Sequence, residues 1–201
     1  MLFFQVLLNP NIDVKMLKNL HYCNVLNNFA ITINVNMNFN EKQVLFIDLD
    51  NTLINTVSGK TFPVDVTDFK IRKEVLDKIV DAFPNLYYIE IVSNQGGIPQ
   101  FVDEADFKGK IRTIEGFVQN YMRNHTQRNV FVVSQYCTSE SDENMRKPNV
   151  GMLLSYSSWN KSKLMMIGDA SGKEGDFSDS DKKCASNFGI DYIDVEDFLN
   201  L

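Results

Sequence analysis

The chain contains few of the residues that build disulfide frameworks or histidine-rich metal sites. Its 201 residues include three cysteines, which lie far apart and form no CxxC pair, and two histidines. Small secreted domains carry a dense set of cysteines, and zinc sites draw on clustered Cys and His ligands. The sequence therefore argues against both classes and predicts reduced thiols in an intracellular protein.

Long apolar runs are also missing. No stretch of about 18 consecutive apolar residues occurs, so we expect no membrane-spanning helix. The apolar opening MLFFQVLLNP has no basic segment before it and no small-residue cleavage site after it, which makes it a poor signal peptide. We expect a protein that is cytoplasmic, or nuclear in a eukaryote, that is not secreted and that binds no membrane.

An excess of positive charge is absent too. The chain has 20 Lys and Arg against 26 Asp and Glu, a formal net charge of -6. Affinity for the phosphate backbone comes from clustered Lys and Arg, so this balance argues against a protein that coats nucleic acid non-specifically. It leaves room for a local basic groove, and the length suits one ordinary globular domain.

Residues 1–40 differ from the rest of the chain. Asparagine is over-represented there, as in NVLNNFAITINVNMNFN, and apolar and polar residues alternate only loosely. We interpret residues 1–40 as an N-terminal extension, either disordered or upstream of the true start, and residues 41–201 as the folded domain. The alternative is that residues 1–40 form an additional strand or helix packed on that domain.

From residue 43 onward, short apolar runs alternate with amphipathic stretches. The runs predict strands at 43–48, 86–93, 129–134, 163–169 and 191–195. The 3.6-residue periodicity predicts helices at 71–83, at about 103–125 and at 180–189, and Pro148 predicts a first helical turn. Strands that alternate with helices indicate right-handed βαβ units. The predicted fold class is α/β, a Rossmann-like three-layer sandwich with a mostly parallel central sheet.

Polar residues stand where these strands end. Asp48 and Asp50 follow the first strand, Ser93 and Asn94 end the second, and Asp169 follows the fourth. In open parallel sheets, ligands bind beyond the carboxyl ends of the strands. These five residues are therefore the candidates for a site at one edge of the sheet.

The segment DLDNT (48–52) carries two carboxylates that project from the same side if the chain stays extended. Like charges held together are costly unless a cation or a shared proton offsets them. A hard dication with oxygen ligands fits, and Mg²⁺ is the usual one beside a phosphate. Taken alone, the segment is explained equally well by a solvated turn.

Three further motifs point the same way. SNQ (93–95) supplies a hydroxyl and an amide, and Lys147 stands at an expected helix start, where backbone N–H groups favour an anion. In GDASGKEGDFSDSD (168–181), one or two of the later acidic residues should complete a metal site with Asp169. A plain turn, a solvated lysine and an acidic loop are the ordinary alternatives. The motifs stand in order at the ends of consecutive strands, and this order favours a shared site over those three alternatives.

This ordered set resembles the haloacid dehalogenase superfamily of phosphatases over about residues 43–200. Within it, TLINTVSGKTFP, IVSNQGGI, RKPNVGM and GDASGKEGDFSDSD are similar to the polynucleotide kinase 3'-phosphatase family. The SGKxF segment and the DFSxSD ending are the most discriminating parts. The resemblance implies a Mg²⁺-dependent phosphoric monoester hydrolase that forms an aspartyl-phosphate.

The resemblance also assigns roles to individual residues. It implies that Asp48 is the nucleophile and that Asp50 is the general acid and base. The implied metal ligands are Asp48, the Asp50 backbone carbonyl and Asp169, and the implied phosphate-binding residues are Ser93, Asn94 and Lys147. Asp176 and Asp181, in the DFSxSD ending, would support the metal ligands without binding the ion.

Two departures narrow this interpretation. GKT at 59–61 looks like the end of a phosphate-binding loop of the Walker A type, but the required earlier Gly would fall at Ile54. We therefore expect no nucleoside-triphosphate site in this chain. The chain also has no room for a large cap domain, and a small insert within 54–70 is expected instead.

The leading hypothesis for the substrate is the 3' end of a nucleic acid, with DNA and RNA equally open and no oligomeric state favoured. Lys60, Phe62, Arg146 and Lys173 would contact the strand. The second hypothesis is a phosphorylated metabolite of the histidinol-phosphate or sugar-phosphate type. The related enzymes usually carry a zinc loop of Cys and His before RKP, where this chain has SQYCTSESDENM. The third is a non-catalytic domain that binds a phosphorylated partner.

Overall fold

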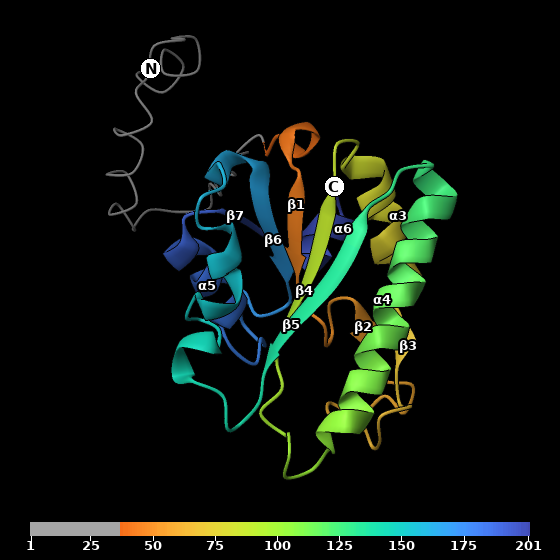
Figure 1. Ribbon diagram of the computed structural model, residues 1–201, viewed down its shortest axis with the longest axis vertical. Coiled ribbons are helices and arrows are strands. Elements are labelled where there is room, and N and C mark those ends of the chain that lie inside the picture. The colour runs from red at the N-terminus through yellow and green to blue at the C-terminus, as the bar shows by residue number, and fades with distance from the viewer. Residues whose placement is uncertain (1–36) are drawn as a thin grey trace, which may run out of the picture. The chain divides into compact units, whose positions relative to one another are not determined.

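Five strands form the central sheet of the computed structural model, which describes residues 37–201 (Figure 1). Their order in space is β5-β4-β1-β6-β7, and every neighbouring pair is parallel. The strands are β1 Val44–Ile47, β4 Tyr88–Asn94, β5 Phe131–Cys137, β6 Leu164–Gly168 and β7 Asp191–Asp194. The predicted α/β fold with a parallel sheet is confirmed.

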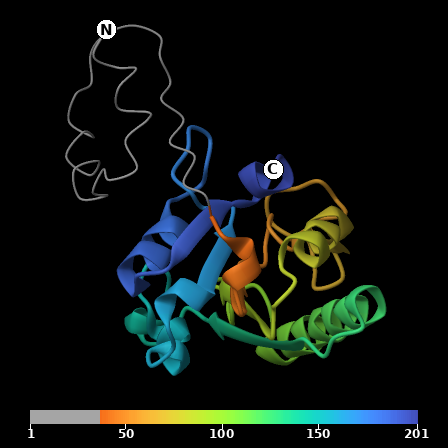
Figure 2. The same cartoon turned by 90° about the horizontal axis from the view of Figure 1, so that it is seen from above.

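Helices cover both faces of this sheet, as Figure 2 shows from above. Their bounds are α3 Lys73–Ala82, α4 Glu104–Thr126, α5 Ser180–Phe188 and α6 Val195–Leu199, with short 3-10 helices at Phe39–Glu41, Glu143–Met145, Gly151–Tyr156 and Lys161–Lys163. The helices α3, α4 and α6 pack on one face of the sheet, and α5 packs on the other together with Gly151–Tyr156. The three layers of the predicted sandwich are therefore present.

The core follows from the alternation of side chains along β1. Leu45 and Ile47 point into the larger core under α3, α4 and α6, while Val44 and Phe46 point into the smaller core under α5. All four are 0% exposed. A strand buried on both faces must be apolar at every position, which explains the continuous apolar run in the sequence.

The predicted domain boundary at residue 41 lies close to the start of the compact unit, which comprises Met37–Leu201. Met37 and Phe39 pack against the larger core, and Phe39 contacts the rings of Phe83 and Phe198. Four residues of the proposed extension thus belong to this unit. The rest of that extension lies outside the described residues.

The helical turn predicted to open at Pro148 begins later, at Gly151, and is the 3-10 helix Gly151–Tyr156. The predicted start was wrong, since Lys147 and Pro148 lie in a loop before this helix. The reason is that Asn94 binds the backbone of Lys147 on both sides: its Nδ2 donates to Lys147 O, and its Oδ1 accepts from Lys147 N, each over 2.9 Å. These bonds fix the loop in a non-helical form.

A small insert follows β1, as predicted, and no large cap accompanies it among residues 37–201. The antiparallel strands β2 (Ile54–Asn55) and β3 (Lys70–Ile71) form its base. The buried carboxylate of Asp68 organises its loop, because it accepts from Ser58 N, Ser58 Oγ and Val64 N at 2.7, 2.6 and 2.9 Å. The insert is therefore built around one acidic side chain.

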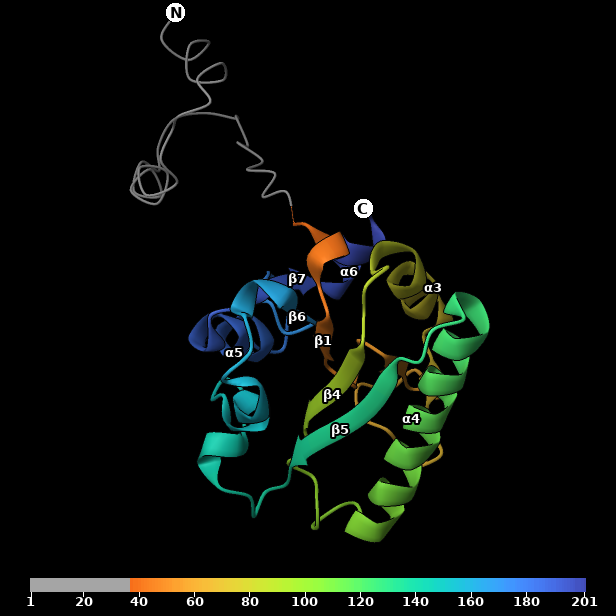
Figure 3. The same cartoon turned by 45° about the horizontal axis from the view of Figure 1, so that its top comes forward.

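The order of the strands places a switch point at β1. The chain moves from β1 to β4 and β5 on one side, and then to β6 and β7 on the other. Figure 3 shows β4 and β5 ending at the same edge of the sheet. Ligands of such sheets bind at the carboxyl edge beside the switch point. None of the helices within residues 37–201 combines the length and the hydropathy that a membrane span requires.

We predict that Asp68→Ala loosens the insert without unfolding the sheet, since three donors then lose their common acceptor. Limited proteolysis should cut within 56–69 several times faster than in the wild type, while the thermal midpoint of the domain changes little. Asp65→Ala is the control, because Asp65 is exposed and accepts from the N–H and the hydroxyl of the nearby Thr67. Equal protease resistance of both variants would show that Asp68 does not hold the insert.

Candidate active site

The candidate residues leave three adjacent strands at the same edge. Asp48 directly follows β1, and its backbone N–H still donates to Ile167 O of β6 over 3.0 Å. Ser93 and Asn94 are the last two residues of β4, and Asp169 follows the last residue of β6. Since β1 lies between β4 and β6 in the sheet, the structure brings these residues together as predicted.

Three carboxylates meet at the centre of this edge. Asp48, Asp169 and Asp181 each offer an oxygen, and these oxygens lie within 4.8 Å of one another. Asp181 comes from the first turn of α5 and is 1% exposed. Gly168 makes this approach possible, because a Cβ at that position would collide with Asp181 Oδ2.

One buried ammonium lies among these carboxylates. Lys147 is 3% exposed, and its Nζ donates to Asp48 Oδ1 and to Val92 O, the latter over 2.7 Å. The same nitrogen lies 2.8 Å from Asp181 Oδ1. A single positive charge therefore faces three carboxylates, and the cluster stays negative if all of them are ionised.

The pKa values reflect this imbalance. Burial raises the pKa of Asp48 well above its ordinary value, and Asp181 and Asp169 add to the rise, while Lys147 opposes it. Burial and the charge of Asp181 raise the pKa of Asp169 to about 6. Burial works against the charge of Lys147, but Asp48 and Asp181 together raise its pKa above the ordinary range. The one positive charge of Lys147 is thus too little to balance the three carboxylates when all of them are ionised.

A hard divalent cation fits this arrangement. The donors are carboxylate oxygens, which Mg²⁺ and Ca²⁺ prefer. The buried Asp181 Oδ1 accepts no well-formed hydrogen bond from the described residues and lies 2.8 Å from Lys147 Nζ, while Asp181 Oδ2 accepts from Ala170 N over 3.2 Å. All three carboxylates are close enough together to hold an ion, and Asp181 also pairs with Lys147.

Asp176, which the motif grouped with Asp181, lies outside the carboxylate cluster. Its Oδ2 accepts from Ser171 N, Ser171 Oγ and Lys173 N at 3.1, 2.6 and 2.9 Å. The Ser171 hydroxyl is the main cause of a lowered pKa of Asp176. Asp176 therefore shapes the loop between β6 and α5.

The amide of Asn94 is also used differently from the expectation. Both of its ends bind the Lys147 backbone, and Oδ1 additionally accepts from Cys137 Sγ at 3.2 Å. The second N–H of Nδ2 is not used by these bonds. Asn94 thus positions the backbone of Lys147, and its contact with a phosphate stays a prediction.

Sequence reasoning left Gln95 out of the candidate residues. Its Nε2 donates to Asp50 Oδ2 over 2.7 Å and to Ser93 Oγ over 2.8 Å. Gln95 thus fixes the half-exposed Asp50 relative to the buried Ser93 hydroxyl. The feature of the sequence that could have identified Gln95 is its place as the third residue of the SNQ motif. The turn after Asp50 is held as well, because Arg72 Nη1 donates to Asn51 O over 2.7 Å.

The four residues expected to contact a nucleic-acid strand have different surroundings. Lys60 and Phe62 are exposed on the insert, Phe62 by 70%. The guanidinium of Arg146 crosses the glycine turn that follows β4. Lys173 is engaged in ion pairs of 2.9 and 2.7 Å with two carboxylates at the end of β7 and the start of α6. The first three remain the better candidates.

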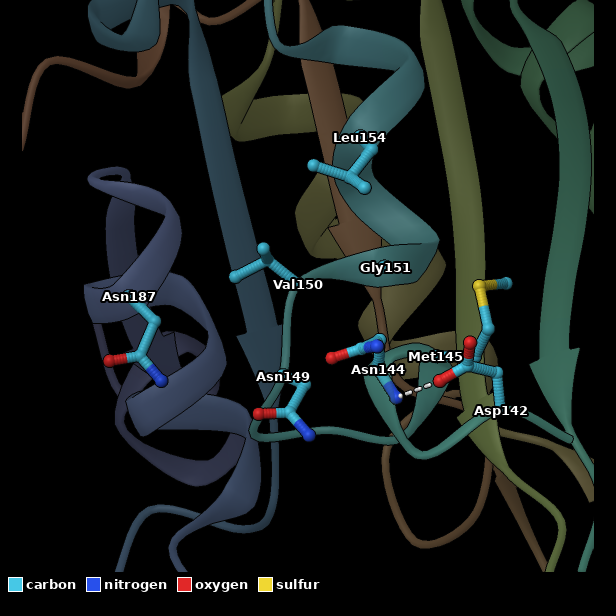
Figure 4. A pocket seen from close by; sticks show the side chains of 8 residues that line it. All are labelled: Asp142, Asn144, Met145, Asn149, Val150, Gly151, Leu154 and Asn187. Atoms are coloured by element: carbon cyan, nitrogen blue, oxygen red, sulfur yellow. Dashed lines mark hydrogen bonds between the residues drawn. The ribbon is translucent and has the colours of Figure 1, made fainter.

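A separate hollow of about 530 Å³ lies beside the Lys147 loop, and Figure 4 shows its side chains. Amide and apolar groups line it, from Asp142, Asn144, Met145, Asn149, Val150, Gly151, Leu154 and Asn187. Two of the three asparagine amides already donate to backbone carbonyls. The hollow contains none of the clustered carboxylates.

Comparison with known proteins supports the resemblance seen in the motifs. The chain is similar to a bifunctional polynucleotide phosphatase/kinase of Schizosaccharomyces pombe, with 32% identity over 165 residues that cover 79% of this chain and 38% of that protein. It is also similar to a putative bifunctional polynucleotide phosphatase/kinase of Acanthamoeba polyphaga mimivirus, with 29% identity over 196 residues, 78% of this chain and 41% of that protein. The chain thus spans about two fifths of these relatives.

The fold is shared with a solved phosphatase. The crystal structure of D,D-heptose 1,7-bisphosphate phosphatase from B. bronchiseptica, complexed with magnesium and phosphate, superposes with a TM-score of 0.52. It covers 75% of this chain and 78% of its own at 14% identity. The model of the family described as polynucleotide kinase 3 phosphatase matches residues 43–199. The chain therefore belongs to the polynucleotide kinase 3'-phosphatase family.

Proposed function

We propose that this protein is a Mg²⁺-dependent phosphatase that removes the 3'-phosphate from nucleic-acid ends. The observation that carries the proposal is the position of the Asp48 carboxylate, which shares the buried Lys147 with Asp181 and lies in one carboxylate cluster with Asp181 and Asp169. Membership of the family supports the reaction class. The named relatives, of which this chain spans about two fifths, support the substrate class.

The chemical difficulty is that an anionic carboxylate must approach an anionic phosphate. Mg²⁺, when held by Asp48, Asp169 and the Asp50 carbonyl, would offset this repulsion. Lys147 supplies a second positive charge, and with the Ser93 hydroxyl it would hold the equatorial phosphate oxygens as charge spreads in the transition state.

The remaining steps use the carboxylates themselves. Asp48 attacks phosphorus in line, the bond to the 3' oxygen breaks, and an aspartyl-phosphate forms. Asp50, held by Gln95 at 2.7 Å, donates a proton to the leaving oxygen. It then accepts a proton from the water that attacks the aspartyl-phosphate. This step releases inorganic phosphate, frees the Asp48 carboxylate and returns Asp50 to the acid form in which it began the cycle.

Exposed aromatic side chains around the site favour a nucleic acid over a small metabolite. Phe62, Phe101 and Phe177 are 70%, 86% and 90% exposed, on the segments that follow β1, β4 and β6. Bases of a single strand stack on aromatic rings of this kind. A small sugar phosphate would leave all three rings in water.

A substrate panel tests this proposal. With Mg²⁺, kcat/KM should be at least tenfold higher for a 3'-phosphorylated oligonucleotide than for the 5'-phosphorylated strand, histidinol phosphate or a sugar phosphate. EDTA should abolish release of phosphate. Faster turnover of a metabolite would overturn the nucleic-acid assignment, and inactivity on every ester would favour a binding domain.

We predict that Asp48→Asn lowers kcat by at least a thousandfold, because an amide cannot take the phosphoryl group. The thermal midpoint should stay within a few degrees of the wild type. Rapid quenching with labelled substrate should give acid-stable phosphoprotein in the wild type and none in the variant. Asp81→Asn, an exposed change on α3, is the control with normal activity. An active Asp48→Asn protein would refute the nucleophile assignment.

We predict that Mg²⁺ raises the thermal midpoint more at pH 7.5 than at pH 5. The pKa of Asp169 is about 6 without the cation, above the ordinary value of about 3.9. Its proton therefore stabilises the fold at low pH, and this contribution is lost as pH rises through 6. Mg²⁺ competes with that proton and offsets the loss. Differential scanning fluorimetry with Mg²⁺ or EDTA checks this, and a pH-independent shift would contradict it.

We predict that Gly168→Ala lowers kcat/KM at least tenfold, because the new methyl group displaces Asp181 and with it Lys147. The control is Gly116→Ala on α4, where nothing lies within 4 Å of the added Cβ. That change should keep full activity and stabilise the helix by about 0.5–1 kcal/mol. Steady-state kinetics and thermal melts of both variants test this prediction. Full activity of Gly168→Ala would show that the close approach of Asp181 to residue 168 is not needed for activity.

A further inference from the structure

Arg72 is a buried arginine that lies between β3 and α3 and is 7% exposed. Its guanidinium donates to acceptors on three separate elements. Nη1 donates to Asn51 O over 2.7 Å, Nη2 to Glu196 Oε1 over 2.8 Å, and Nε to Glu74 Oε1 over 2.9 Å. One side chain thus connects the turn of the first motif with the first turns of α6 and α3.

The turn that Arg72 contacts directly follows Asp50 and has an unusual backbone. Asn51 has a φ of 58°, in the left-handed region, where the Cβ of an L residue is crowded by the backbone. Such a conformation persists only where the surrounding contacts specify it. Arg72 supplies two of these contacts, because its backbone N–H also donates to Leu53 O, over 2.9 Å.

The bond to Asn51 O differs in character from the two ion pairs. The side chains of Glu74 and Glu196 are 57% and 64% exposed, and ion pairs with exposed carboxylates contribute little to stability. These glutamates do offset the charge of the guanidinium. The carbonyl of Asn51 receives a charge-assisted hydrogen bond, which is stronger than a bond between neutral groups.

Asp50 is thereby held from two sides. Gln95 Nε2 donates to its carboxylate over 2.7 Å, and Arg72 fixes the backbone one residue further along. In the proposed function, on which this inference rests, Asp50 protonates the leaving 3' oxygen, and such a transfer requires hydrogen-bond distance. We propose that Arg72 is a positioning residue that holds the turn of the first motif so that Asp50 reaches the leaving group.

Two oligonucleotides that differ only in the bridging atom test the inference. One carries an ordinary 3'-phosphate, and in the other sulfur replaces the bridging 3' oxygen. When the P–S bond breaks, the thiolate leaves as a stable anion that needs no proton. A misplaced acid therefore slows the oxygen substrate alone. Rates are compared at saturating Mg²⁺, and thermal melts establish that each variant is folded.

Arg72→Met should lower kcat/KM for the oxygen substrate by about tenfold to a hundredfold, and for the sulfur substrate by no more than about threefold. Asp50→Asn should show the same selective loss and sets its upper limit. Arg72→Lys keeps a positive charge beside the two glutamates and should fold like the wild type. It should still lose part of the oxygen rate, because one ammonium cannot reach three separate acceptors.

The matched control is the double variant Glu74→Gln and Glu196→Gln. Each glutamine keeps an oxygen that accepts from the guanidinium, and the bond from Arg72 to Asn51 O is untouched. The control should keep both rates within about twofold of the wild type. A control that loses the oxygen rate as strongly as Arg72→Met would show that the ion pairs, and not the bond to the turn, are required.

The outcomes separate this inference from the proposed function. If Asp50→Asn is slow on the oxygen substrate alone, but folded Arg72→Met and Arg72→Lys keep both rates or lose them equally, the role of Arg72 is refuted and the function stands. Equal losses in Asp50→Asn, or a wild type inactive on the sulfur substrate, would remove the acid role of Asp50 and this inference with it. If the wild type hydrolyses neither oligonucleotide, the proposed function itself fails.

Discussion

The structure depends on the gathering of three carboxylates, two buried and one partly buried, around one buried ammonium. Asp48, Asp169 and Asp181 approach one another within 4.8 Å, and Lys147 alone offsets their charge within the described residues. Such a cluster is costly for a folded chain, since burial and mutual repulsion both oppose ionisation. Its cost is understandable if the same imbalance draws in a divalent cation and a phosphate. The excess of negative charge then explains both the free-energy cost to the fold and the proposed chemistry.

The sheet makes this cluster possible by holding its members from different elements. β1 and β6 deliver Asp48 and Asp169 side by side, α5 delivers Asp181, and the loop after β5 delivers Lys147. Close packing is needed at each junction, as the absence of a side chain at Gly168 shows. The parallel sheet supplies rigidity, and the loops supply the functional groups.

Around the cluster, the edge of the sheet stays open within residues 37–201. A small insert held by Asp68 flanks it, where a large cap would exclude a polymer. Phe62, Phe101 and Phe177 are exposed on the segments that follow β1, β4 and β6. In the proposed function, the cluster carries out the phosphate chemistry, and these rings stack on the bases of the substrate.

The sequence by itself determined the five strands of the central sheet, the helices α3, α4 and α5, and the places of Asp48 and Asp169 at the ends of two strands. Apolar periodicity is a local property, and Asp48 and Asp169 follow strands whose parallel order places them together. The tertiary structure decided what depends on pairs distant in the chain. It showed that Asn94 clamps the Lys147 backbone and that Gln95 bridges Ser93 and Asp50. Side-chain hydrogen bonds and the burial of a lysine leave no periodic trace, so only the folded chain reveals them.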